Sequence, residues 1–169
     1  MSYLYAMKRR AVFILLCLLP AVLMAQEIPS WKITRLEEYI RSAKEPVLVI
    51  NFWATFCKPC VAEIPHFISV TEQKGSDSVR LLLVSLDLPS SYPGKISSFA
   101  GKQGWKVSLA WLNETNADYF CPRIDPSWSG SIPATLFVNT RTGYRYFVED
   151  EIDARRLEQE LDKALSGHR

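Results

Sequence analysis

Two cysteines separated by two residues, Cys57 and Cys60, are the residues whose type and spacing most clearly predict chemistry. A thiol pair at this spacing can open and close a disulfide, and a helix N-terminus lowers the pKa of the first thiol. Cys57 is therefore predicted to be the exposed, attacking sulfur, and Cys60 the more buried sulfur that resolves the mixed disulfide. Between them, Pro59 suits the first turn of a helix. Lys58 adds a positive charge that favours the thiolate and a more oxidising potential.

Two other interpretations of the cysteine pair are a structural disulfide and one half of a metal site. A zinc site needs four ligands, and the chain contains no second Cys-x-x-Cys and only two histidines, His66 and His168. We therefore favour a redox pair and expect neither a metal nor a cofactor. His66 is expected on a helix surface rather than in the chemistry.

The elements around the pair place it at the junction of a strand and a helix. The continuous apolar run of residues 47–52 predicts a strand that is buried on both faces. A helix is predicted to begin near Cys57 and to turn Ile64 and Phe67 toward the sheet, with Pro65 inside it. The cysteines should thus occupy a fixed position at one edge of the sheet.

The rest of the chain alternates between predicted strands and helices, as in an α/β domain. The expected helices cover residues 31–43, 96–103, 113–120 and 153–165, and the other strands cover 79–86, 107–112, 133–139 and 144–148. Thr34 and Glu37 have the spacing of a capping box for the first helix. Residues 121–131 are expected to be irregular. The alternation predicts parallel crossovers early in a mixed sheet, and the last two strands predict a hairpin.

Four motifs in order then give a family resemblance: Asn51–Phe56, Cys57–Cys60, Glu63 with Pro65, and Gly130–Thr135. Together they resemble the thioredoxin-like superfamily and, within it, the exported TlpA/ResA-like thiol–disulfide oxidoreductases. The resemblance covers about residues 32–165. It implies a thioredoxin fold, a central mixed sheet flanked by helices, with an extra helix–strand unit at about residues 92–112.

The same resemblance assigns a partner-binding surface. It implies that Pro133 follows a cis peptide bond and that the backbone of Ile132 faces the disulfide, where it can pair with an extended partner segment. Trp53, Phe56, Lys58 and Pro59 are expected to complete this surface, with Phe56 where relatives usually carry Trp.

Two further residues have alternative roles. Glu63 stands where the exported relatives carry a Glu, while Asn51 replaces the buried Asp of thioredoxins proper. If Glu63 is buried, its pKa should rise and it could help to deprotonate Cys60; otherwise it is an exposed carboxylate near the helix dipole. Cys121 is either a third redox cysteine or, as we prefer, a buried or idle thiol.

The N-terminus has the pattern of an export signal. Lys8-Arg9-Arg10 precedes the apolar residues 11–24, and Ala25 offers a cleavage point, so residues 1–25 are predicted to be a signal peptide or an uncleaved anchor. Residues 26–169 form the expected thioredoxin-like domain. Its 17 basic and 18 acidic residues give no electrostatic case for binding nucleic acid. The expected location is the periplasm, either free or attached to the outer face of the inner membrane.

The predicted function is reduction of protein disulfides through the Cys57–Cys60 dithiol. The resemblance implies a membrane thiol carrier as electron donor and cytochrome c maturation proteins among the partners. The alternatives are an exported thiol peroxidase and a non-enzymatic adaptor with the same fold. A peroxidatic site normally needs a Thr/Ser-x-x-Cys motif with a supporting Arg, and neither is evident around Cys57.

Overall fold

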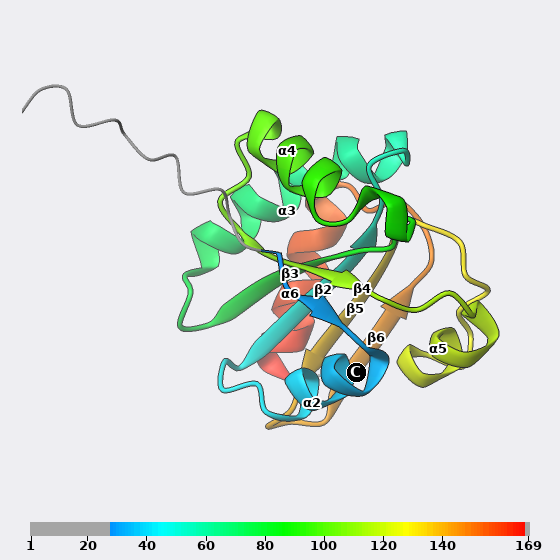
Figure 1. Cartoon of the computed structure of the whole chain (residues 1–169). Coiled ribbons are helices and arrows are strands. Elements are labelled where there is room, and N and C mark those ends of the chain that lie inside the picture. Colours follow the sequence, from blue (N-terminus) through cyan, green and yellow to red (C-terminus); the bar gives the residue numbers. More distant parts are fainter. Residues whose placement is uncertain (1–27, 168–169) are drawn as a thin grey trace, which may run out of the picture.

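The structure, a computed structural model, describes residues 28–167 as a six-stranded mixed sheet with helices on both faces (Figure 1). The strands are β1 (Ser30–Trp31), β2 (Val47–Trp53), β3 (Val79–Ser85), β4 (Ser108–Leu112), β5 (Ala134–Asn139) and β6 (Tyr144–Val148). The helices are α2 (Ile33–Arg41), α3 (Lys58–Lys74), α4 (Gly94–Gln103), α5 (Ala117–Ile124) and α6 (Ala154–Ser166), with a 3-10 turn at Pro89–Ser91.

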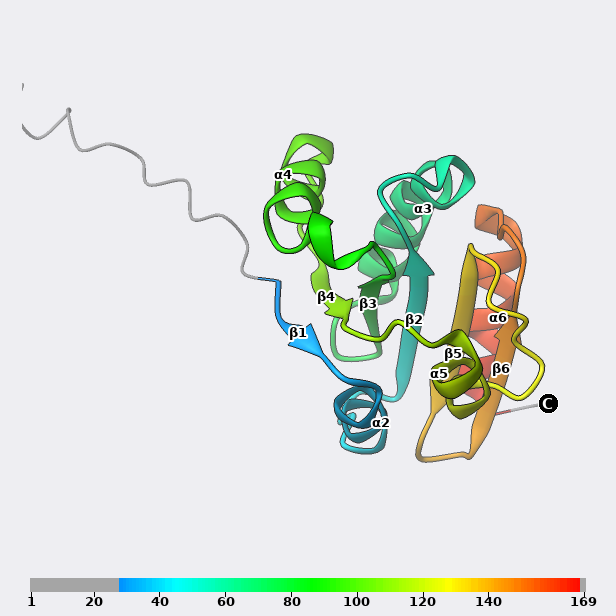
Figure 2. The same cartoon turned by 45° about the vertical axis from the view of Figure 1, so that its right-hand side comes forward.

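The strand order across the sheet is β1-β4-β3-β2-β5-β6, which Figure 2 shows side by side. Strands β2, β3 and β4 run parallel, whereas β5 is antiparallel to β2 and forms a hairpin with β6. Helices α3, α4 and α6 pack on one face, and α2 and α5 on the other. The predicted α/β architecture is confirmed, and α4 with β4 is the predicted extra helix–strand unit.

Strand β2 is the centre of the sheet because all seven of its residues are buried. Its side chains alternate between the two cores: Val49 and Trp53 pack toward α3 and α4, while Ile50 and Phe52 pack toward α2 and α5. Burial on both faces explains why its sequence is a continuous apolar run. At the C-terminal end of this strand, the chain turns into α3 (Figure 2).

Two predictions about the first helix were wrong. Trp31 does not begin a helix but ends β1, because it pairs with Leu112 of β4. The N-cap residue of α2 is Lys32, so Thr34 lies inside the helix and the predicted capping box is absent from this part of the structure. Glu37 instead receives hydrogen bonds from Arg123 of α5. Contacts with β4 and α5, which are distant in the sequence, therefore outweigh the local sequence pattern that predicted an earlier helix start with a capping box.

The prediction of an irregular segment after residue 120 was also partly wrong. Helix α5 continues through Cys121 to Ile124, and it includes Pro122. Phe120, Cys121 and Ile124 are the buried residues of this helix, so packing against the sheet stabilises a helix that Pro122 alone would argue against.

The predicted signal segment, residues 1–25, and His168 lie outside the described residues. Within residues 28–167, none of the helices combines the length and the hydropathy that crossing a membrane requires.

Candidate active site

Cys57 and Cys60 form a disulfide at the start of α3. Cys57 is the N-cap residue of this helix, and its Sγ accepts a hydrogen bond from the Cys60 N–H at 3.3 Å. The predicted place at a helix N-terminus is therefore confirmed, and unpaired N–H groups there favour a thiolate at Cys57. Cys57 is less exposed than predicted, at 8% against 0% for Cys60. It is still the sulfur that a partner can reach.

A buried carboxylate after β3 holds the turn that precedes Cys57. Asp87 accepts hydrogen bonds from the Thr55 N–H at 3.0 Å and the Thr55 hydroxyl at 2.6 Å. The Ser85 hydroxyl donates to the same carboxylate at 2.8 Å. Asp87 was not among the site residues predicted from the sequence. An acid directly after a buried strand that runs parallel to β2 is a signal that could have identified it, because both strands end at the same edge of the sheet.

Behind Cys60 lies a buried polar group that we call the floor cluster: Asn51, Glu63, Thr135 and the backbone of Ile152. The Asn51 Nδ2 donates to Glu63 Oε1 at 2.7 Å and to the Thr135 hydroxyl at 3.0 Å. The Ile152 N–H donates to Glu63 Oε2 at 2.9 Å. Each oxygen of the Glu63 carboxylate therefore has one donor.

Glu63 is 1% exposed, so it is not the exposed carboxylate that the sequence left as an alternative. Burial raises its pKa to about 7; the hydrogen bonds from Ile152 and Asn51 act in the opposite direction, and the charges of Glu151 and Asp150 add to the increase. A carboxyl group with this pKa exchanges a proton readily near neutral pH. It lies one helical turn after Cys60. Asn51 does not titrate, so α3 rather than β2 supplies the buried acid.

The opposite wall of the site is the segment of residues 129–133, which we call the docking loop. The Ile132–Pro133 peptide bond is cis, as predicted. The Ile132 carbonyl oxygen lies 3.8 Å from Cys57 Sγ, so the backbone of Ile132 does face the disulfide. Glu149, which follows β6, accepts hydrogen bonds from this loop. No local pattern in the sequence distinguishes Glu149 from its acidic neighbours.

The predicted partner-binding residues divide into two groups. Phe56, which is 65% exposed, and the exposed side chains of Lys58 and Pro59 surround Cys57. Trp53 is fully buried, and its ring packs against Phe99 and Trp105 with centroid distances of 6.0 and 5.0 Å. Its assignment to the partner surface was wrong, because the last side chain of β2 faces the core beneath α4.

Cys121 is a free, buried thiol on α5, as we preferred. Burial raises its pKa to about 11, and the charges of Glu149 and Asp118 act in the same direction. Its Sγ lies 3.8 Å from the position that a Cβ would take on Gly130, a residue with a φ of +101° in the docking loop. Cys121 thus packs behind the loop rather than facing the disulfide.

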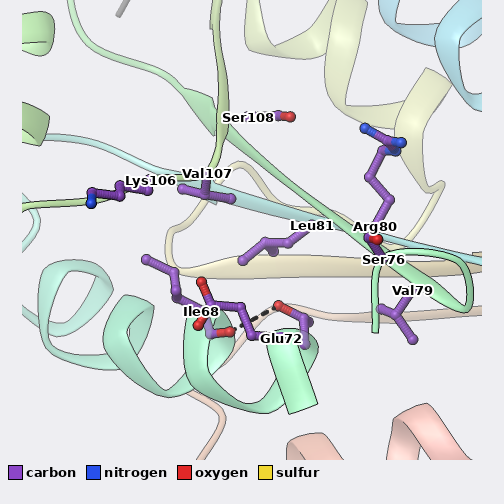
Figure 3. A pocket seen from close by; sticks show the side chains of 10 residues that line it. Ile68, Glu72, Ser76, Val79, Arg80, Leu81, Lys106, Val107 and Ser108 are labelled. Carbon is purple, nitrogen blue, oxygen red and sulfur yellow. Dashed lines mark hydrogen bonds between the residues drawn. The ribbon is translucent and has the colours of Figure 1, made fainter. Parts of the chain in front are cut away.

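In the described part of the chain, no three His, Cys, Asp or Glu side chains are grouped so that they could hold a metal ion. A cavity of about 360 Å³ lies between the second half of α3 and the start of β3 (Figure 3). Its walls include Ile68, Glu72, Leu81 and Lys106, so it lies at the end of α3 opposite to the disulfide. The chemistry and this cavity are therefore separate.

Comparisons with known proteins agree with this geometry. A sequence model described as the AhpC/TSA family matches residues 23–143. Sporulation thiol-disulfide oxidoreductase A of Bacillus subtilis (strain 168) is 42% identical over 38 residues, which cover 22% of this chain and 23% of that protein. Thiol-disulfide oxidoreductase ResA of Oceanobacillus iheyensis is 40% identical over 40 residues, which cover 24% of this chain and 21% of that protein. Each of these two matches thus spans less than a quarter of the relative's length.

Among solved structures, that of a thioredoxin-related protein from Neisseria meningitidis serogroup B is similar to the structure of this chain, with a TM-score of 0.65. It is 24% identical, and the match covers 75% of this chain and 90% of that one. The predicted thioredoxin fold is confirmed.

Proposed function

The chain belongs to the AhpC/TSA family, and from this premise we propose that it is a thiol–disulfide oxidoreductase that reduces disulfides in partner proteins. The observation that carries the proposal is the Cys57–Cys60 disulfide at the N-terminus of α3, with a buried carboxyl group of pKa about 7 one turn further on. The short matches to two thiol-disulfide oxidoreductases support the same reaction class.

The reaction follows from the positions of the two sulfurs. In the reduced protein, the Cys57 thiolate attacks one sulfur of the partner disulfide, forms a mixed disulfide and releases the first partner thiolate. The Cys60 thiolate then attacks Cys57 Sγ, which restores the Cys57–Cys60 disulfide and releases the second partner thiolate. Two electrons pass to the partner. Glu63 as a carboxylate accepts the Cys60 proton, and the partner thiolates take up protons from solvent.

The partner is placed by the two walls of the site. An extended partner segment can pair with the backbone of Ile132 while its disulfide lies against Cys57. Phe56, Lys58 and Pro59 provide an exposed rim around this position. The proposed substrates are therefore protein disulfides rather than small molecules held in a closed pocket.

We also propose that the reaction takes place in the periplasm. The basic and apolar pattern of residues 8–25 supports export to the periplasm, free or attached to the outer face of the inner membrane. Resemblance to the TlpA/ResA-like proteins supports a membrane thiol carrier as electron donor and cytochrome c maturation proteins as partners.

The test is reduction of insulin disulfides with dithiothreitol as the electron source. The wild-type protein should accelerate the reaction, and Cys57→Ser should abolish the acceleration. Cys60→Ser should retain the first attack and accumulate a mixed disulfide. An equal rate for wild type and Cys57→Ser would support the adaptor, and peroxide-dependent turnover of Cys57 without insulin reduction would support the peroxidase. A reduction potential near −270 mV supports a reductase, whereas one near −120 mV supports an oxidant.

A further inference from the structure

Glu149 binds the docking loop through several hydrogen bonds at once. Its carboxylate accepts from the Ser129 N–H at 2.9 Å and the Ser131 N–H at 2.7 Å, and also from the Ser129 hydroxyl. Burial alone would raise the pKa of Glu149, but the hydrogen bonds from Ser129 and Ser131 outweigh it and the pKa is lowered. The group is therefore an ionised acceptor at neutral pH.

The position of Glu149 explains why a side chain makes these contacts. The pairing of β5 with β6 ends at Thr135 and Val148, and Glu149 is the next residue. In the same register, Ala134 would lie opposite Glu149, and Pro133, which has no N–H to donate, would lie opposite Asp150. The Glu149 carboxylate instead reaches past this proline to the two N–H groups of Ser129 and Ser131.

These contacts leave Ile132 as the open part of the loop next to the disulfide. Ser131 is fully used, since its N–H donates to Glu149 and its carbonyl oxygen accepts from the Trp128 indole at 2.9 Å. The Ile132 carbonyl oxygen contacts Cys57 Sγ. Within residues 28–167, the Ile132 N–H has no hydrogen-bond acceptor. The main chain of Ile132 is thus held in place from one side and free on the other.

We propose that Glu149 is a positioning residue for substrate binding: its carboxylate fixes the docking loop so that the main chain of Ile132 is presented to an extended segment of the partner protein. This inference rests on the proposed function. It assigns Glu149 to binding of a peptide backbone and not to the exchange of sulfur–sulfur bonds.

The test compares two substrates that differ in whether they have a peptide backbone. The rates of reduction of insulin and of a small aromatic disulfide are to be measured for the wild type, Glu149→Ala and Glu149→Gln, with dithiothreitol as the electron source. For insulin, Glu149→Ala should raise KM by about 2- to 10-fold, the effect of one backbone hydrogen bond, with kcat unchanged. Glu149→Gln keeps one acceptor oxygen and should fall between Glu149→Ala and the wild type. The rate with the small disulfide should not change.

Glu158→Gln is the matched control, because it removes one negative charge from an exposed position on α6. It should behave as the wild type with both substrates. Amide hydrogen exchange gives an independent readout: exchange at Ser129 and Ser131 should be faster in Glu149→Ala than in the wild type.

Three outcomes overturn the inference: an unchanged KM for insulin in Glu149→Ala, an equal loss of rate with both substrates, or unchanged exchange at Ser129 and Ser131. The activity of the wild type tests the proposed function separately. If the wild type reduces neither disulfide, the proposed function fails, and the amide exchange still decides whether Glu149 holds the loop.

Discussion

Two glutamates flank the disulfide: Glu63 belongs to the floor cluster behind Cys60, and Glu149 holds the docking loop beside Cys57. Both accept hydrogen bonds from backbone N–H groups, yet the two carboxyl groups differ in pKa. Glu63 has two donors and is 1% exposed, and burial raises its pKa to about 7. Glu149 has three donors and is partly exposed, and its pKa is lowered. The balance between desolvation and hydrogen bonding decides which carboxyl group can carry a proton.

This difference in pKa suits the two glutamates to different roles beside the same disulfide. A group with a pKa near 7 can alternate between acid and base during turnover, whereas a permanently ionised group can hold a backbone in one conformation. We therefore predict that substitutions in the floor cluster change the pH dependence of stability and of Cys60 alkylation, whereas substitutions at Glu149 change substrate binding.

The largest effect expected from this comparison is on the pH dependence of stability. The folded-state pKa of Glu63, about 7, lies above its ordinary value of 4.5, so its contribution to stability is full below pH 4.5 and is lost as pH rises through 7. The loss is on the order of 3 kcal/mol. Urea unfolding of the oxidised protein between pH 4.5 and 8 should show this decline in the wild type and not in Glu63→Gln. Parallel curves for the two proteins would contradict the raised pKa.

Glu149→Gln is the opposing control for this measurement. The folded-state pKa of Glu149 is lowered, so its contribution is present above pH 4.5 and is lost as pH falls through the folded-state value. The stability difference between wild type and Glu149→Gln should thus be constant from pH 5 to 8. A difference that shrinks over this range would mean that the two carboxyl groups are not distinct.

A smaller effect should follow from removing the Asn51 donor. The Asn51 Nδ2–H stabilises the ionised form of Glu63, whereas Asn51 Oδ1 is buried without a hydrogen-bond partner among the described residues. Asn51→Leu keeps a similar volume and should raise the pKa of Glu63 by about one to two units, since a charged hydrogen bond contributes about 1.5–3 kcal/mol. The midpoint of Cys60 alkylation in the reduced protein reports this shift. Thr71→Val, which removes a buried hydroxyl bonded to Phe67, is a control that should leave the midpoint unchanged.

Much of the fold could be predicted because the strongest local signals agree with the tertiary structure. Strand β2 is apolar throughout and buried throughout. The alternation of helices and strands required the parallel crossovers that β2, β3 and β4 show. Strand β1 could not be predicted, since two residues carry no period and only pairing with β4 makes them a strand. Helix α5 was misjudged at Cys121–Ile124 because its packing outweighs the signal of Pro122.

At the site, residues near the cysteine pair in sequence could be predicted, and residues brought there by the fold could not. The N-cap position of Cys57 and the burial of Cys60 follow from local spacing. The contact between Asn51 and Glu63 depends on how α3 crosses β2, and the contact of Glu149 with Ser131 depends on where the β5–β6 hairpin ends. The assignment of Trp53 was wrong because side chains along a strand point alternately to the two faces of the sheet. The sequence alone did not show that α4 covers the face to which Trp53 points.

The smallest effect on activity is expected for substitution of Cys121, which we predict packs behind the docking loop without taking part in the redox reaction. Its thiol is buried with a pKa of about 11, so little thiolate forms at pH 8. After brief treatment of the reduced, native protein with iodoacetamide at pH 8, mass spectrometry should find Cys57 modified and Cys121 intact; Cys121 should react only after unfolding. Cys121→Ala should leave insulin reduction unchanged and lower stability slightly, because Ala fills less of the space beside Gly130. Rapid native modification of Cys121, or a loss of turnover in Cys121→Ala, would instead make it a third redox cysteine.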